Sequence, residues 1–274
     1  MAMKFMYITN DPQVARIAQN RGVDRIWIDL ETRGKDQRQK GHKMILSNHT
    51  IEDIKRIRPI LSKAELMVRI NSWNPHSKEE IDNVINAGAD IVMLPYWKTV
   101  KEVKEFLDAL NGRAKNILLL ETKEAVEVLD DILELEGINE IFIGLNDLHL
   151  SYGMKFLFEP LAEGIVDKIA HKIMAKNFPF GFGGVARLGY GWIPAENILM
   201  EQYRLGASLA ILSRSFCNVD LLVDYDEIDR LFDVELKRIR EFEKSIYNMT
   251  EEEVRKNHEH VKGLVADIVQ QAGE

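Results

Sequence analysis

The stretch Asn116–Asp147, NILLLETKEAVEVLDDILELEGINEIFIGLND, contains the repeat unit that decides the fold. Its two apolar runs, Asn116–Thr122 and Glu140–Asp147, are continuous rather than alternating, which is typical of strands buried on both faces of a parallel sheet. Between them, Glu124–Leu135 has the apolar spacing of an amphipathic helix and is followed by a glycine, Gly137. The stretch therefore predicts one β-α-β unit with two neighbouring parallel strands.

The same alternation of short apolar runs and helix-period segments continues in both directions along the chain. Eight such units in about 220 residues predict an α/β fold, a (β/α)8 TIM barrel. A doubly wound open sheet is the alternative. No linker rich in Pro, Gly or Ser divides residues 1–220, which we expect to form the catalytic barrel domain. The other six strands are expected at Lys4–Thr9, Arg25–Glu31, Glu65–Asn71, Ile91–Tyr96, Phe178–Gly184 and Leu209–Phe216.

Residues 221–274 exceed what eight such units require and predict a C-terminal helical extension. Its first helix begins near Tyr225 and carries an apolar stripe that would promote aggregation if it faced water. We therefore expect these helices to pack on a neighbouring subunit, which would make the protein a homo-oligomer. The stripe consists of Ile228, Leu231, Phe232, Leu236 and Ile239.

Charge and composition exclude several classes of function. The chain of 274 residues has a net charge of −8, and a nucleic-acid partner would require a basic surface instead. No apolar run reaches the roughly 18 residues that span a bilayer, so no membrane partner is expected. The single cysteine, Cys217, excludes an internal disulfide, and residues 1–10 lack the apolar core of a secretory signal. A cytoplasmic location is therefore predicted.

Polar side chains at the carboxyl ends of barrel strands face the active site. Glu121 and Asp147 end neighbouring strands, where two carboxylates repel each other unless a proton or a cation lies between them. Because carboxylate oxygens suit Mg²⁺ or Mn²⁺, the pair predicts a divalent-cation site. The alternative is that each carboxylate caps the following helix or pairs with a lysine. The full set of strand-end positions is Thr9, Asp29, Glu31, Arg69, Asn71, Tyr96, Glu121, Asp147, Gly183, Gly184 and Arg214.

Arg69 lies inside an apolar strand, in Met67–Asn71. A buried guanidinium needs an anion, and its planar fork matches the two oxygens of a carboxylate or an enolate. Arg69 is therefore a candidate for substrate binding and catalysis. An ion pair with Glu31 or Glu121 is the structural alternative, and both interpretations can hold as long as no ligand is bound.

Several of these stretches together resemble the HpcH/HpaI aldolase and citrate lyase β-subunit family. The resemblance covers residues 5–216, and its pieces occur in the order and spacing of that family. Members of the family are TIM barrels that make or break carbon–carbon bonds beside a 2-oxo acid or a CoA thioester, with Mg²⁺ or a similar ion. The matching pieces are Trp27–Glu31 (WIDLE), Val68–Asn71 (VRIN), Gly88–Pro95 (GADIVMLP), Leu120–Thr122 (LET) and Ile143–Leu148 (IGLNDL), followed by Gly153.

The resemblance implies a role for each matching polar residue. Glu121 and Asp147 would be the metal ligands, and Arg69 would stabilise a pyruvate enolate. The backbone around Gly144, Asn146 and Asp147 would hold the substrate carboxylate. These roles predict a metal-dependent carbon–carbon lyase of the class II aldolase type that acts on pyruvate or a related 2-oxo acid.

One position departs from the family's pattern. Pyruvate aldolases of the family carry a histidine directly after the glutamate of the second strand, and this histidine pairs with the strand's aspartate, here Asp29. This chain has Thr32 at that position, and the second acid of the citrate lyase branch is missing as well. A CoA-thioester lyase of the citrate lyase type and a non-catalytic metabolite-binding barrel are therefore kept as alternatives.

The loop Thr32–His49, which follows the second strand, is strongly basic. His42 or His49 could supply the missing base, because histidine titrates near neutral pH. Lys35 and Arg38 could hold an anionic substrate. A solvated charged loop without a role in the site is the alternative.

Overall fold

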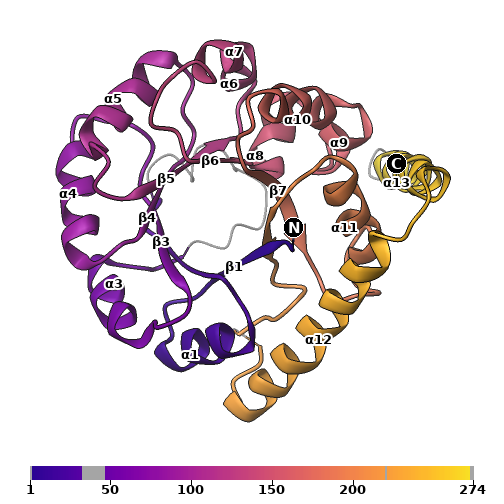
Figure 1. Cartoon of the computed structure of the whole chain (residues 1–274), viewed down its shortest axis with the longest axis horizontal. Coiled ribbons are helices and arrows are strands. Elements are labelled where there is room, and N and C mark those ends of the chain that lie inside the picture. Colours follow the sequence, from indigo (N-terminus) through magenta and orange to yellow (C-terminus); the bar gives the residue numbers. More distant parts are fainter. Residues whose placement is uncertain (1, 33–46, 220, 272–274) are drawn as a thin grey trace.

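A closed barrel of eight parallel strands forms the centre of the computed structural model, which describes residues 2–32, 47–219 and 221–271 (Figure 1). Each strand pairs with the next in sequence, and β1 pairs with β8 to close the barrel. The predicted (β/α)8 barrel is confirmed, and the open sheet is excluded. The strands are β1 (Lys4–Ile8), β2 (Arg25–Asp29), β3 (Glu65–Arg69), β4 (Ile91–Leu94), β5 (Lys115–Leu120), β6 (Glu140–Ile143), β7 (Phe180–Val185) and β8 (Leu209–Leu212).

Helices surround the barrel and cover the outer faces of its strands (Figure 1). The segment Glu124–Leu135, expected as one helix, is divided in two because Val128 leaves the helical conformation, with φ −99° and ψ 7°. The helices are α1 (Pro12–Arg21), α3 (Ile51–Ile57), a 3-10 turn (Arg58–Ile60), α4 (Ser77–Ala87), α5 (Val100–Leu110), α6 (Lys123–Glu127), α7 (Leu129–Ile132), α8 (Leu145–Ser151), α9 (Glu159–Ala162), α10 (Ile165–Ala175), α11 (Ala195–Arg204), α12 (Tyr225–Ile246) and α13 (Glu251–Gln271).

Strand β6 ends earlier than the sequence predicts. The apolar run Glu140–Asp147 was expected to be one strand, but β6 stops at Ile143 and α8 begins at Leu145. Asp147 consequently lies in the first turn of α8, and the prediction that it ends a strand is wrong. The run joins a buried strand to the apolar first turn of a short helix, which hydrophobicity alone does not separate.

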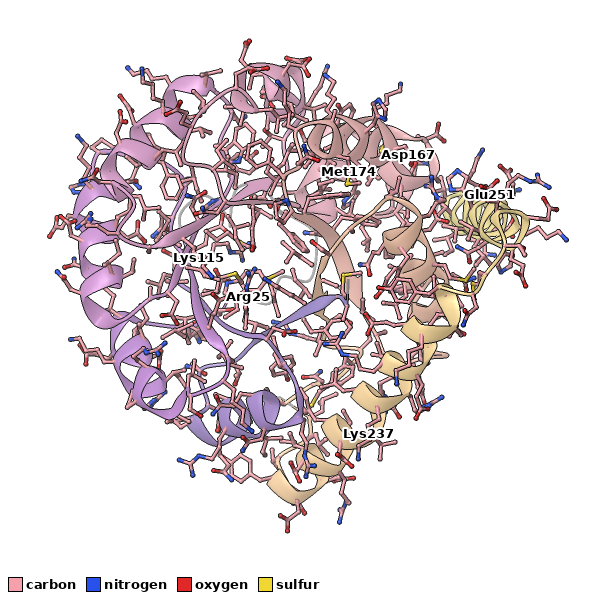
Figure 2. The ribbon with its side chains drawn as sticks, in the orientation of Figure 1. Arg25, Lys115, Asp167, Met174, Lys237 and Glu251 are labelled. Carbon is pink, nitrogen blue, oxygen red and sulfur yellow. The ribbon has the colours of Figure 1, made fainter. Side chains whose placement is uncertain are left out.

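The barrel interior has an ionic cluster at the amino ends of the strands, below an apolar layer. Arg25 is completely buried and donates to both carboxylate oxygens of Glu140, at 2.5 and 2.7 Å. Arg25 also donates to Glu65 at 3.0 Å, and Lys115 donates to the same carboxylate at 2.5 Å. Figure 2 shows Arg25 and Lys115 toward the centre of the ring of strands. The apolar layer above consists of Met6, Trp27, Met67, Ile91, Met93, Ile117, Leu119, Phe142 and Leu209.

The C-terminal helices cover the same barrel from outside. Helix α12 packs on α1 and α11, and α13 packs on α11 and α9. In the predicted apolar stripe, Ile228, Phe232, Leu236 and Ile239 are buried within the chain and Leu231 is half-buried. The stripe therefore serves the chain's own core, and α12 completes the eighth β/α unit across the predicted boundary at residue 220. Contact of these helices with a neighbouring subunit stays a prediction.

Among residues 2–32, 47–219 and 221–271, no helix has both the length and the apolar character for crossing a bilayer.

Candidate functional site

An ion-pair cluster lies at the carboxyl ends of β2 and β3. The strand register places Asp29 opposite Arg69. Nε and Nη2 of Arg69 each donate to one carboxylate oxygen of Asp29 at 2.8 Å, and Nη1 lies 3.2 Å from Oε2 of Glu31. The guanidinium also lies over the Trp27 ring, 4.9 Å from its centroid. Two parallel hydrogen bonds fix the plane of the guanidinium as well as its position.

Nearby carboxylates keep the Arg69 guanidinium charged. Burial alone would lower the pKa of Arg69, but the charges of Asp29, Glu31 and Glu121 and the hydrogen bonds to Asp29 raise it above its usual value. The ion pair with Glu31 that the sequence suggested is present, and Glu121 acts on Arg69 through its charge. The site thus holds one buried guanidinium among three carboxylates, in surroundings from which water is largely removed.

The carboxylate of Glu121 is held at the barrel mouth by backbone that follows the neighbouring strand β4. Glu121 follows β5 directly and is 3% exposed. Its Oε1 accepts a hydrogen bond from the backbone N–H of Tyr96 at 2.9 Å. Tyr96 lies in the left-handed region, with φ 52°, a conformation that is rare outside glycine and recurs at functional sites.

Gly144 leaves the space that the Glu121 carboxylate occupies. A Cβ at position 144 would lie 2.7 Å from Oε2 of Glu121 and 2.9 Å from its Cβ. The backbone N–H of Gly144 donates to the carbonyl of Leu120, which keeps the two chain segments in register. Glu121 can therefore lie against the start of α8 only because residue 144 has no side chain.

The predicted ligand Asp147 and the predicted substrate contact Asn146 lie in the first turn of α8. Gly144 is the N-cap of this helix, so Glu121 and Asp147 belong to the same corner of the barrel mouth. Asp147 is half-buried and Asn146 is exposed. Amides in the first turn of a helix have no partner within the helix and can bind an anion.

The donor set at this corner fits a hard divalent cation. In the described part of the chain, no group of three or more His, Cys, Asp or Glu side chains is arranged to hold a metal ion. Among the described residues, an ion at this corner would be held by Glu121 and Asp147, and water or substrate oxygens could complete its coordination. Mg²⁺ and Mn²⁺ suit this pattern, because Mg²⁺ keeps several waters and binds through one or two carboxylates.

Thr32 stands where the family's pattern has its histidine, and His49 lies against the backbone of Asp29. The backbone N–H of Thr32 donates to Oδ1 of Asn71 at 3.0 Å. Nδ1 of His49 accepts a hydrogen bond from the backbone N–H of Asp29 at 3.1 Å. A ring nitrogen that accepts from an amide carries no proton, so neutral His49 carries its proton on Nε2. In this arrangement the lone pair of Nδ1 is engaged by the Asp29 amide, and the role of His49 as a base stays a prediction.

The other predicted residues of the loop, Lys35, Arg38 and His42, lie outside the described residues. Their predicted roles as anion-binding side chains and as the catalytic base stay predictions.

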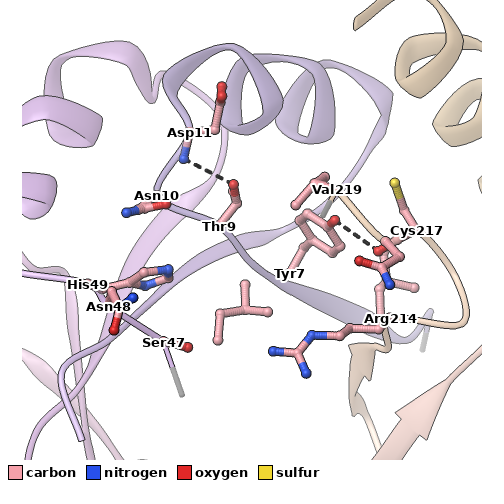
Figure 3. Close-up of a pocket in the computed structure, with 13 residues that line it drawn as sticks. Tyr7, Thr9, Asn10, Asp11, Ser47, Asn48, His49, Arg214, Cys217 and Val219 are labelled. Carbon is pink, nitrogen blue, oxygen red and sulfur yellow. Dashed lines mark hydrogen bonds between the residues drawn. The ribbon is translucent and has the colours of Figure 1, made fainter. Parts of the chain in front are cut away.

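A pocket of about 250 Å³ lies beside the ion-pair cluster, between the carboxyl ends of β1 and β8 (Figure 3). Arg214 lines it from the segment after β8, and Thr9 lines it from the end of β1. Asn48 and His49 line it from the segment before α3. Because His49 also accepts the hydrogen bond from Asp29, one wall of the pocket continues directly into the cluster.

Sequence reasoning missed three features of the site. The Tyr96 amide, the space at Gly144 and the contact between His49 and Asp29 all depend on backbone conformation, which residue types do not reveal. The one available signal was the glycine between two apolar stretches at position 144, since such a glycine often marks a close approach.

The fold and the site define a (β/α)8 barrel with a carboxylate–arginine cluster at its carboxyl mouth. Residues 3–159 match the HpcH/HpaI aldolase/citrate lyase family, and the chain belongs to this family. The chain is 26% identical over 141 residues to the 2-keto-3-deoxy-L-rhamnonate aldolase of Escherichia coli (strain K12), a match that covers 40% of this chain and 53% of the relative. It thus spans about half the length of the curated relatives that it matches.

Solved structures share the architecture. The HpcH/HpaI aldolase from Desulfitobacterium hafniense DCB-2 superposes with a TM-score of 0.61 and 15% identity, over 77% of this chain and 86% of that one. The citrate synthase SbnG superposes with a TM-score of 0.60 and 17% identity, over 88% of this chain and 94% of that one. At these identities the likeness extends to the fold alone.

Proposed function

We propose that the protein is a divalent-metal-dependent carbon–carbon lyase of the class II aldolase type, which cleaves or forms an aldol bond to pyruvate or a related 2-oxo acid. The observation that carries the proposal is the arrangement at the barrel mouth, where Arg69, oriented by Asp29, lies beside Glu121. Membership of the family supports the class of reaction. A cytoplasmic location and a small-molecule substrate are part of the same proposal.

The residues of the cluster have different roles in the proposed aldol cleavage. In the cleavage direction, the bond between C3 and C4 breaks, and its electron pair becomes the enolate of the 2-oxo acid. Arg69 stabilises the negative charge that grows on the enolate oxygen, and Asp29 holds the guanidinium in the required plane. The proton of the C4 hydroxyl passes to a base, for which His42 is the candidate from the sequence. Lys35 and Arg38 would bind an anionic part of the substrate.

Glu121 and Asp147 would hold the divalent cation, Mg²⁺ or Mn²⁺. When bound, the ion supplies Lewis-acid polarisation of the 2-oxo acid's oxygens. The first-turn amides around Gly144 and Asn146 would orient the substrate carboxylate. Glu121 is kept in its ligand position by the Tyr96 amide and by the space at Gly144.

A barrel that binds a metabolite without turnover is the second candidate function. Thr32 favours it, because the family's histidine is missing and His49, with Nδ1 facing the Asp29 amide, does not replace its basicity. A CoA-thioester lyase stays the alternative within enzymes. Formation of an enolate from pyruvate distinguishes the proposed lyase from these alternatives.

Enolate formation can be measured without knowing the acceptor aldehyde. The full chain is incubated with pyruvate and Mg²⁺ in D₂O, and exchange of the pyruvate methyl protons is followed by NMR. We expect exchange that requires the metal and is at least about 100-fold slower in Arg69→Ala, because the lost charge acts on the transition state. Arg230→Gln, a change at an exposed arginine on α12, is the matched control. Absence of metal-dependent exchange in the wild type would refute the lyase.

A further inference from the structure

We propose that the pocket between β1 and β8 is the subsite for the acceptor aldehyde, and that Arg214 selects an aldehyde bearing a carboxylate or phosphate group. The inference rests on the proposed function, because it names the second substrate of the same site. The pocket is formed by described residues of β1, β8 and the segment before α3 (Figure 3).

The position of the pocket suits the partner of an enolate. His49 lines the pocket and accepts a hydrogen bond from the backbone of Asp29, whose carboxylate binds Arg69. Thr9, also in the lining, donates its backbone N–H to the carbonyl of Trp27 on the neighbouring strand. A molecule in the pocket would therefore lie next to one held by Arg69, as bond formation between two substrates requires.

The charges around the pocket favour an anion. Its described lining contains one arginine, Arg214, and one aspartate, Asp11. The Asp11 carboxylate is turned to other groups, since Oδ1 accepts from the backbone N–H of Gln13 and Val14 at 2.7 and 3.0 Å. Its Oδ2 accepts from the hydroxyl of Tyr225 at 2.9 Å. Arg214 lines the pocket with a guanidinium, which binds carboxylate and phosphate in a planar, bidentate way.

The size and the neutral lining restrict the ligand further. A volume of about 250 Å³ corresponds to roughly eight water molecules, which admits a three- or four-carbon aldehyde with its charged group. Asn10, Asn48 and Asn218 provide amides that can hydrogen-bond hydroxyl groups of the ligand.

His49 has a defined part in this subsite. Because Nδ1 accepts from the Asp29 amide, the proton of the neutral ring lies on Nε2. His49 therefore donates a hydrogen bond to the aldehyde oxygen and takes no proton from it. His49→Asn is the informative change, since an amide oxygen can still accept from Asp29 while the Nε2–H is lost.

The test compares aldehydes that share a carbon chain and differ by a charged group. Aldol addition to pyruvate is measured with 4-oxobutanoate against butanal, and with D-glyceraldehyde 3-phosphate against D-glyceraldehyde. We expect the wild type to prefer the charged member of at least one pair by about 10- to 100-fold in kcat/KM, as the loss of a charge-assisted hydrogen bond implies. The preferred pair tells carboxylate from phosphate.

Arg214→Gln should abolish that preference, whereas Arg214→Lys should keep part of it. The control Arg230→Gln, at an exposed position of α12, should keep the wild-type preference and the wild-type rate of pyruvate proton exchange. His49→Asn should slow neutral and charged aldehydes alike. An unchanged preference in Arg214→Gln overturns the proposal.

A second measurement keeps the subsite testable if no aldehyde is turned over. Calorimetry with inorganic phosphate and with succinate is carried out on the wild type, Arg214→Gln and Arg230→Gln. Binding of either anion that weakens at least about tenfold in Arg214→Gln alone supports the subsite even where absent proton exchange refutes the lyase. Equal binding of both anions by the three proteins refutes the subsite, whatever the fate of the lyase.

Discussion

At the scale of single residues, the direction of the Glu121 carboxylate depends on one backbone amide. The N–H that Glu121 accepts belongs to Tyr96, whose φ of 52° lies in the left-handed region. This conformation costs a non-glycine residue roughly 1–2 kcal/mol, and asparagine tolerates it better than most. The strain is tolerated at the position where it directs an amide toward a candidate metal ligand.

We predict that Tyr96→Val lowers the free energy of unfolding by about 1–2 kcal/mol more than Tyr96→Asn does. Both changes remove the ring, so the difference isolates the backbone, which a β-branched side chain strains most. Urea unfolding of the two variants and the wild type measures it. Equal losses in the two variants would mean that the left-handed conformation carries no strain.

The sequence could predict the pairing of those residues whose side chains need an oppositely charged partner when they are buried. An arginine inside an apolar strand requires an anion, so the pairing of Arg69 with a carboxylate could be predicted, and Glu31 was among the expected partners. The bidentate contact with Asp29 needed the strand register. The acceptor role of His49 needed the path of the chain before α3, which no residue pattern specifies.

At the scale of elements, the connection from β6 to α8 aligns two candidate ligands. The chain turns from strand to helix at Gly144, which brings the first turn of α8, with Asp147, to the corner that Glu121 occupies. Strand positions followed from the continuous apolar runs, because a covered parallel sheet requires them. The end of β6 could not be predicted from these runs, because Leu145 continues the apolar run although it belongs to the helix α8.

Gly144→Ala should displace the Glu121 carboxylate, since the new Cβ would lie 2.7 Å from its Oε2. We expect Mg²⁺ or Mn²⁺ affinity, measured by calorimetry, to fall at least about tenfold while the circular dichroism spectrum stays unchanged. Gly263→Ala is the matched control, because a Cβ there meets nothing within 4 Å and lies in the helix α13. Wild-type metal affinity in Gly144→Ala would show that Glu121 is not a ligand.

At the scale of the whole molecule, the cluster of Arg25, Glu65, Lys115 and Glu140 links four strands at the amino end of the barrel. Burial raises the pKa of Glu65, but the hydrogen bond from Lys115 and the charge of Arg25 outweigh it and lower the pKa below its usual value. A carboxyl group whose pKa is lower in the folded state stabilises the fold at neutral pH. That contribution is lost as the pH falls through the lowered pKa.

The free energy of unfolding should therefore fall on acidification below the ordinary pKa of glutamate, about 4.3, and fall less in Glu65→Gln. Urea unfolding at pH 7 and at successive pH values from 5 to 3 measures the slope. Glu241→Gln, at an exposed position of α12, should keep the wild-type slope. The same slope in Glu65→Gln and the wild type would show that the lowered pKa of Glu65 does not contribute to the stability of the fold.

The oligomeric state also belongs to this scale. The stripe on α12 is used within the chain, but Val234 of the same helix is 51% exposed and Tyr247, just after it, is 56% exposed. We predict that the full chain is an oligomer in light scattering and that Val234→Glu weakens it, because a charge would be buried at the contact. A monodisperse monomer at micromolar concentration would contradict this.

The apolar layer between the two ionic clusters separates an amino end that stabilises the barrel from a carboxyl end that carries the candidate site. Arg25 and Asp29 are four residues apart on one strand, roughly 13 Å, and the amino-end cluster contains two positive and two negative side chains. A balanced group at that distance exerts a weak field, so changes at the two ends should combine additively. Substitutions of Arg214 or His49 at the mouth should therefore change substrate specificity without lowering the stability that the amino-end cluster provides.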